Sequence, residues 1–222
     1  MKIQTALAAL ATLVLATPVM AQSDAGMRIT AGVTGGTLGI GPEVGLRFSD
    51  HFGVRGNATF LGIGADFDSD DITYKGDLKL KSFGAMLDAY PFGGSFRVSG
   101  GARINRNYAG VRASTTGSVE VGGDTYTSAQ VGVLTGRADV KDLAPALTLG
   151  WGGSNRKGFI FGTELGVLFQ GKARLRQFTS NGTLSNNAAF NASLERERRD
   201  LQDDIDKVSV YPIAQIMIGW RF

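Results

Sequence analysis

Apolar residues recur at every second position through most of the chain, and this alternation restricts the fold more than any other feature of the sequence. In the C-terminal segment, apolar side chains occupy the even-numbered positions from Val208 to Phe222. Similar runs cover 96–104, 143–151 and 159–169. A period of two is typical of a β-strand, whose successive side chains point to opposite faces of a sheet. The sequence therefore predicts an all-β fold.

The face opposite the apolar one carries glycines and full charges. Arg97 and Arg103 fall on this face of one predicted strand, and Glu164 falls on it in another. A soluble β-sandwich also alternates, but it has an aliphatic core and a polar outer face. A barrel with lipid outside and a charged interior explains both faces. Because backbone groups in lipid must all be paired, such a chain closes into an antiparallel transmembrane β-barrel.

The first 21 residues have the pattern of a cleaved signal peptide. Lys2 supplies the positive charge, and an apolar stretch of eleven residues runs from Ala6 to Ala16. Pro18 ends this stretch, and the small residues that a signal peptidase reads precede Gln22. The stretch is too short to cross a bilayer as a helix. We therefore expect a signal peptide at 1–21, one barrel domain at 22–222 and a location in the cell outer membrane.

Connections between the alternating segments are short and long in turn, which is typical of outer-membrane barrels with short periplasmic turns and long extracellular loops. The short ones lie at Ser49–Phe52, Phe92–Ser95 and Gly152–Lys157, and a tight hairpin is expected at Gly35-Gly36. The long connections are expected at 66–77, 107–141 and 171–207. Eight strands follow, at 28–35, 37–48, 53–66, 78–91, 96–107, 142–151, 159–171 and 208–222.

Three segments carry a resemblance to a known class of protein: the strand end Gly45–Asp50, the turn Tyr90–Gly94 and the terminal strand Tyr211–Phe222. Aromatic residues also gather at the short-turn end, as in an interfacial girdle. The chain resembles the small eight-stranded outer-membrane barrels of Gram-negative bacteria, of the OmpA, OmpX and OmpW kind. The resemblance implies that the barrel-assembly machinery is a partner and reads a C-terminal signal, here Ile218, Trp220 and Phe222.

Extending the alternation places nine charged residues inside the barrel. They are Arg28, Glu43, Arg47, Arg55, Asp88, Arg97, Arg103, Glu164 and Arg221. An eight-stranded barrel is barely wide enough for its own side chains, which favours a closed network of ion pairs in which Glu164 neutralises Arg97 or Arg103. The alternative is a narrow path lined by arginines that conducts anions or other small solutes.

The long connections contain three further features. Asp66 to Asp77 superficially resembles a calcium loop, but Asp71 stands where glycine is needed, so we expect a solvated acidic loop without metal. A hairpin is expected around Gly122-Gly123-Asp124. In the last loop, Ser193 is the expected N-cap of a short helix that carries Leu194, Leu201 and Ile205, with Phe190 in the loop before it.

The composition excludes several functional classes. The chain has no cysteine and one histidine, His51, which lies in a predicted periplasmic turn, so neither a catalytic constellation nor a cofactor is expected. The net charge is +3, and the sequence shows no cluster of basic residues of the kind that nucleic-acid binding usually needs. Lys79 and Lys81 point outward and are candidates for contact with lipopolysaccharide phosphates. We expect a structural or surface-interaction role, and the alternative is an OmpW-like conduit for small or hydrophobic solutes.

Overall fold

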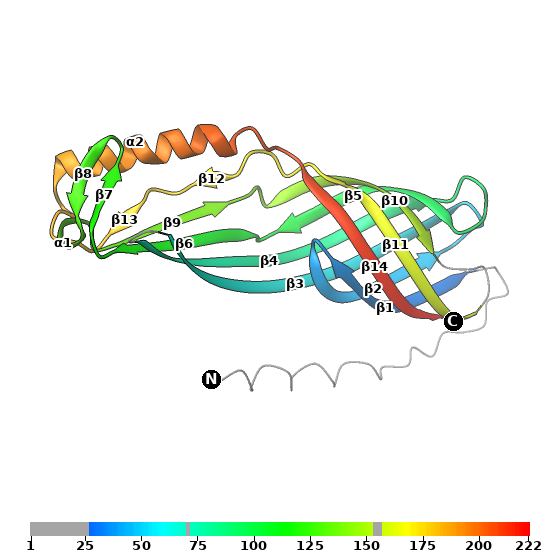
Figure 1. Ribbon diagram of the computed structural model, residues 1–222. Helices are drawn as coiled ribbons and strands as arrows, with labels where there is room; N and C mark the ends of the chain where they lie inside the picture. Colours follow the sequence, from blue (N-terminus) through cyan, green and yellow to red (C-terminus); the bar gives the residue numbers. More distant parts are fainter. Residues whose placement is uncertain (1–26, 70–71, 153–156) are drawn as a thin grey trace, which may run out of the picture.

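The computed structural model describes residues 27–69, 72–152 and 157–222, so the predicted signal peptide lies outside the described residues (Figure 1). Its two helices are α1, Ser128–Val131, and α2, Ala188–Ile205. Its strands are β1 Arg28–Gly36, β2 Gly39–Arg47, β3 Phe52–Ser69, β4 Ile72–Ala89, β5 Phe96–Asn105, β6 Tyr108–Thr115, β7 Ser118–Val121, β8 Asp124–Thr127, β9 Val133–Asp139, β10 Leu143–Gly152, β11 Gly158–Leu168, β12 Arg174–Leu175, β13 Thr179–Ser180 and β14 Tyr211–Arg221.

Eight strands close into an antiparallel ring in the order β1-β2-β3-β4-β5-β10-β11-β14, and β14 pairs again with β1. The closing pair runs from Thr30 opposite Arg221 to Gly36 opposite Gln215. Beyond the last pair, the Phe222 backbone N–H donates to the Ile29 carbonyl at 3.0 Å. Closure leaves no unpaired sheet edge in the ring. The prediction of an eight-stranded antiparallel barrel is therefore confirmed.

The hairpin between β1 and β2 lies two residues later than the sequence suggested. Gly36 pairs with Gly39, so the turn consists of Thr37 and Leu38 rather than Gly35-Gly36. Gly39 has a φ of +100°, which L side chains rarely adopt, and a Cβ there would lie 2.8 Å from the Phe60 backbone. The positive φ and this close contact explain why glycine stands directly after the turn.

The sheet continues beyond one end of the ring, where the sequence suggested long loops. β3 and β4 stay paired from Phe52 opposite Ala89 to Ser69 opposite Ile72, so the expected acidic loop at 66–77 is mostly strand. β6 pairs with the outer half of β4, β9 pairs with β6, and both β12 and β13 pair with β9. The predicted long connections 107–141 and 171–207 thus include paired strands, and the short helix expected in the second of them is present as α2. We call β6, β9, β12, β13 and the outer halves of β3 and β4 the extension (Figure 1).

A small cap covers the far end of the extension and consists of β7, β8, α1 and α2 (Figure 1). The β7–β8 hairpin turns at Gly122-Gly123, as predicted. The predicted N-cap at Ser193 is wrong, because Asn187 caps α2 by accepting hydrogen bonds from the Ala189 and Phe190 backbone N–H groups at 2.9 and 3.1 Å. Phe190, expected in a loop, is fully buried inside the cap.

The helix docks through a face that the predicted stripe only partly describes. Phe190, Ser193 and Leu194 are the buried residues of α2, whereas Leu201 is 42% exposed. The Phe190 ring meets the Tyr126 ring edge-on at 4.9 Å, and Val121, Val131 and Phe178 complete the buried cluster. None of the helices in the described residues is long and apolar enough to cross a membrane.

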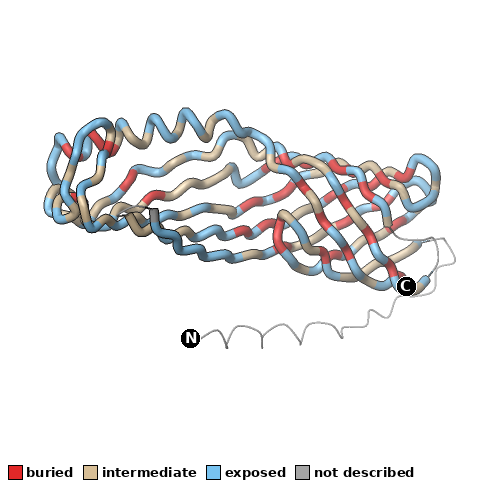
Figure 2. The backbone as a smooth tube through the Cα atoms, viewed as in Figure 1, coloured by how far each residue is buried: buried red, intermediate tan, exposed pale blue. Residues whose placement is uncertain are grey.

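Burial in the ring is the inverse of that in a soluble protein (Figure 2). Large apolar side chains face outward and are exposed, as Leu87 at 67% and Phe159 at 66% illustrate. The buried side chains of the ring include arginines, carboxylates and hydroxyls. Soluble monomers rarely expose apolar patches of more than a few hundred Å², so a belt of this extent around a closed sheet needs an apolar surrounding.

Candidate functional site: the charged interior of the barrel

Eight of the nine charged residues expected inside the barrel are buried in the structure. They are Glu43, Arg47, Arg55, Asp88, Arg97, Arg103, Glu164 and Arg221. The ninth, Arg28, is half-buried at the first residue of β1 and pairs with Asp50 at 2.7 Å. All eight residues lie on ring strands. The two-residue period of each strand places their side chains on the inner face.

Arg55 is the centre of the network. Its Nε and one Nη lie 3.2 Å from the two carboxylate oxygens of Asp88, which makes a bidentate pair. The other Nη lies 3.4 Å from Glu43 and also donates to Glu164. One guanidinium on β3 thus joins carboxylates from β2, β4 and β11, which are spread around the ring. This geometry ties strands together across the interior.

Glu164 bridges Arg55 and Arg97, and the Arg97–Glu164 pair measures 3.0 Å. Of the two partners predicted for Glu164, the structure therefore places Arg97 beside it. Arg103 instead donates to the Ser82 hydroxyl at 2.9 Å and to the Thr59 hydroxyl at 3.3 Å. Among the described residues, no carboxylate oxygen lies within 4.0 Å of the Arg103 guanidinium. Arg103 is thus a buried cation held by hydroxyl groups.

Arg47 lies at the turn end of the ring, which we define as the end with the short connections. Its guanidinium donates to the backbone carbonyls of Ser49 and Asp50 in one turn and of Gly93 and Gly94 in another. The same group lies 3.8 Å from the centroid of the Tyr90 ring. One side chain therefore satisfies the carbonyls of two turns and stacks on the Tyr90 ring.

Little free space surrounds these groups. A cavity of about 30 Å³ lies among Arg47, Arg55, Arg97 and Arg221, which is room for about two water molecules. Toward the cap end, the interior becomes apolar where Leu38, Met86, Ala144, Ala146, Leu168 and Ile213 pack together. The turn end of the interior is thus lined by charged side chains, and the part toward the cap end is lined by packed apolar side chains.

The sequence analysis missed the neutral polar residues of the interior. The buried set also includes Thr34, Thr59, Ser82, Ser99, Asn105, Thr148 and Gln215. Ser99 donates to Asp88 at 2.6 Å, and Asn57, only partly buried, donates to Glu43 at 3.1 Å. These residues share the inward parity of the charged ones, so the period of two was a sufficient signal to find them.

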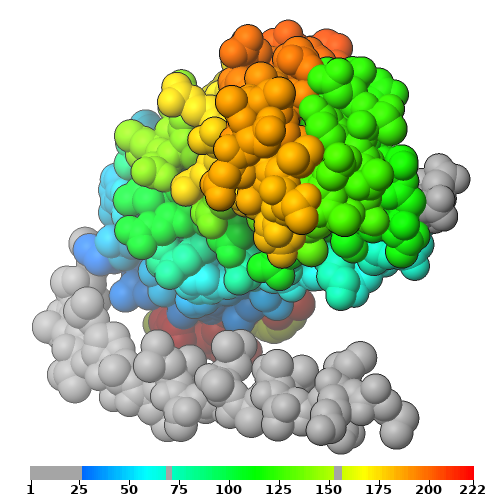
Figure 3. Space-filling model, turned by 90° about the vertical axis from the view of Figure 1, so that its left-hand side faces the viewer, coloured from blue at the N-terminus to red at the C-terminus, as the bar shows by residue number. Residues whose placement is uncertain are grey.

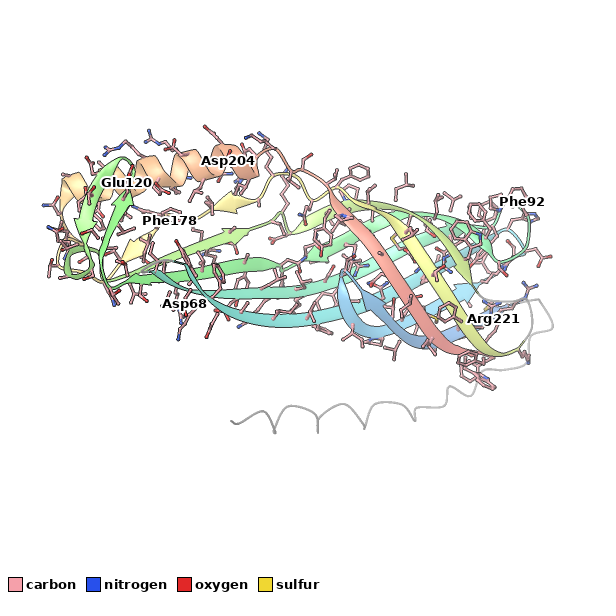
Figure 4. The ribbon with its side chains drawn as sticks, viewed as in Figure 1. Asp68, Phe92, Glu120, Phe178, Asp204 and Arg221 are labelled. Atoms are coloured by element: carbon pink, nitrogen blue, oxygen red, sulfur yellow. The ribbon has the colours of Figure 1, made fainter. Side chains whose placement is uncertain are left out.

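The other predicted site residues lie on the outer surface or at the ring ends. Lys79 and Lys81 are exposed on β4, and the Lys81 ammonium lies 5.8 Å from the Phe83 ring. Ile218, Trp220 and Phe222 alternate on the outer face. Arg221 lies at the turn end and Phe178 in the cap end (Figure 4). His51 is exposed in a turn, and the described residues contain no group of three or more His, Cys, Asp or Glu residues that could hold a metal ion.

In the extension, ion pairs connect β9 to the segment that leads to the cap. Asp139 on β9 accepts from Arg137 at 2.9 Å and from Arg176, which lies beside β12. Burial raises the pKa of Asp139, but hydrogen bonds from the two arginines outweigh it and hold this pKa below the usual value. Asp139 thus stays ionised at neutral pH and holds β12 against the sheet.

The arrangement defines the chain as a closed eight-stranded β-barrel with a charged interior and a capped extension. No protein-family model matches the chain, and no curated protein matches it in sequence. Two solved structures are similar in fold. Acinetobacter baumannii CarO2 has 19% identity and a TM-score of 0.59, over 88% of this chain and 98% of its own. Acinetobacter baumannii CarO has 18% identity and a TM-score of 0.56, over 87% of this chain and 97% of its own.

Proposed function

We propose that the chain is an integral outer-membrane β-barrel protein whose interior is closed and whose cap and extension form its contact surface. The observation that carries this proposal is the inverted burial of the ring, with apolar side chains outside and charged side chains inside. A closed barrel pairs all of its backbone groups internally, which is the condition for crossing lipid with strands. The fold shared with CarO and CarO2 is compatible with it.

The distribution of aromatic residues supports a membrane position for the ring. Phe48, Phe52, Phe92, Phe159 and Trp220 are exposed at or near the turn end. The Phe96 ring packs near the rings of Phe92 and Trp151, with centroid distances of 6.0 and 5.0 Å. Aromatic rings favour the headgroup level of a bilayer, so this girdle marks one interface. The turn end then faces the periplasm, and the extension and cap face outward.

The closed interior is favoured by the side-chain contacts. Arg55 joins three carboxylates, Arg47 bridges two turns at the turn end, and the adjacent cavity has a volume of only about 30 Å³. The alternative function is a narrow conduit for small solutes. Five buried arginines face three buried carboxylates, and this excess of positive charge would select anions if water entered.

A membrane test separates the barrel from a soluble protein. We expect the mature chain to require detergent, to give a β-dominated circular dichroism spectrum and to migrate faster on SDS gels when unheated than when boiled. In planar bilayers we expect no steady current, because the interior is filled. A monomer that is soluble without detergent contradicts the barrel proposal, and a steady anion-selective current favours the conduit instead.

The proposed partners are lipopolysaccharide, through Lys79 and Lys81, and the barrel-assembly machinery. Deletion of Phe222 is expected to reduce insertion at least about tenfold, because its N–H pairs with the Ile29 carbonyl and its ring belongs to the proposed C-terminal signal. Folded protein in purified outer membranes is the measurement. Phe67→Ala, at a 54% exposed residue of the extension outside the ring, is the control. Equal insertion of both variants removes this role from Phe222. No catalytic role is proposed.

A further inference from the structure

Beyond the ring, the sheet face that continues the barrel interior is apolar. Tyr74 on β4, Ala113 on β6 and Leu134 on β9 are register partners, so they lie side by side on this face. In the row nearer the ring, Val111 pairs with Gly136, which has no side chain to fill the space above it. The extension thus presents a concave apolar surface rather than the polar surface usual for a solvent-facing sheet.

The cap lies over this surface and leaves a cavity of about 310 Å³ between them. From the cap side, the cavity is lined by Val119 and Val121 of β7, by Val131 of α1 and by Leu201 of α2. Phe178 closes it beside Gly136. Seen from the cap end, α2 (orange) and the β7–β8 hairpin (green) lie side by side over part of the molecule (Figure 3).

The size of the cavity sets the size of the ligand. An engineered apolar cavity of about 150 Å³ holds one benzene molecule and stays dry otherwise. The cavity here has twice that volume, and it falls at the lower limit of about 300 Å³ for natural ligand pockets. Two fused six-membered rings therefore fit within the cavity.

The charges at the cavity select against anions. Glu120 and Glu197 are its two ionisable acidic lining residues, and the lining residues that the structure describes include no lysine or arginine. Glu197 accepts a hydrogen bond from the Gly122 backbone N–H at 3.0 Å, which holds its carboxylate in place. A carboxylate on a ligand would meet two like charges and no cation, so a fatty acid or an aromatic acid is disfavoured.

We propose that this cavity is a binding site for a small uncharged aromatic molecule of about the size of naphthalene. The site lies outside the ring, between the extension and the cap. This proposal goes beyond the proposed function, because binding at the site does not depend on whether the barrel interior is open or closed. Ligand capture here would take place on the outward side of the membrane, before any contact with lipid.

Methyl NMR of the full mature chain in lipid nanodiscs tests the proposal with naphthalene as the probe. We expect the methyl signals of Val121, Val131 and Leu134 to shift and saturate as naphthalene is added. The methyl groups of Val44 and Ile218, which face outward from the ring, report partition into lipid and should change without saturation. Trp151 and Trp220 also face outward from the ring, so their fluorescence should likewise change without saturation.

Matched variants locate the site. Ala113→Leu fills the cavity and is expected to weaken naphthalene binding at least about tenfold. Ala109→Leu makes the same change on the same strand, at an exposed residue outside the lining, and should leave binding unchanged. Leu201→Gln alters a lining residue that is 42% exposed, so it should weaken binding several-fold without affecting folding.

Several outcomes overturn the proposal. These are the absence of a saturable shift, equal effects of Ala113→Leu and Ala109→Leu, and binding of 2-naphthoate as tight as that of naphthalene. If Ala113→Leu does not fold, unchanged binding in Leu201→Gln overturns it. Another such outcome is that the same methyl signals shift and saturate when the protein concentration is raised in the absence of naphthalene. This result would overturn the proposal and show that a second copy of the chain occupies the cavity. If the membrane test shows a soluble monomer, the same naphthalene titration is done in buffer without nanodiscs, so failure of the proposed function and failure of this proposal can be distinguished.

Discussion

Glu164→Gln is expected to lower the free energy of unfolding by about 3–5 kcal/mol, the usual cost of breaking a buried ion pair. The substitution keeps the shape of the side chain but removes the charge that neutralises Arg55 and Arg97. Both guanidiniums are buried, so they remain desolvated with weaker partners. The measurement is the temperature at which the fast-migrating form disappears from unboiled SDS gels, supported by equilibrium unfolding in urea.

Glu120→Gln provides the control, because it makes the same chemical change at an exposed residue of β7 outside the ring. We expect its effect to stay within about 0.5 kcal/mol. If the interior holds water instead, the arginines are already hydrated and Glu164→Gln should leave stability unchanged. An unchanged unfolding temperature together with an anion-selective current would contradict the closed interior and favour the conduit.

Phe190→Ala is expected to unfold the cap while the ring stays intact. Phe190 is fully buried against Tyr126, Val121 and Leu194, and its loss leaves a cavity that costs about 3–5 kcal/mol. The cap has a small core, so this loss removes most of its stability. Hydrogen exchange should increase in β7, β8 and α2, and a protease should cleave α2, whereas ring amides stay protected.

Phe67→Ala is the matched control for this prediction. Phe67 lies at the same end of the molecule, but it is 54% exposed and stacks only on Tyr74, at 5.1 Å. We expect a loss of less than about 1 kcal/mol and an unchanged cap. Equal exchange in the two variants would show that the cap does not depend on the Phe190 cluster. Unfolding of the ring in Phe190→Ala would show that cap and ring fold as one unit.

The sequence alone was sufficient to identify the eight strands and the inward side chains, because both depend on a local rule. A strand turns every second side chain to the same face, so the parity of Arg55, Asp88 and Glu164 follows from their positions in the chain. The predicted distribution, with apolar side chains outside and charged side chains inside, also indicated a membrane barrel. Which residues meet across the interior is not a local property. It depends on the stagger between strands, and that stagger brings Glu164 to Arg55 and Arg97 rather than to Arg103.

The extension and the cap were decided only by the tertiary structure. The inner faces of β6 and β9 carry mostly small residues such as Ala109, Ala113 and Gly136, and β12 and β13 have two residues each, so the period of two does not separate them from loops. They become strands because the outer half of β4 offers an unpaired edge on which β6, then β9, can pair. The helix likewise has its N-cap at Asn187 rather than at Ser193 because Phe190 gains a buried site against the hairpin. Local periodicity determines which way a side chain points, whereas long-range pairing and packing determine what it meets there.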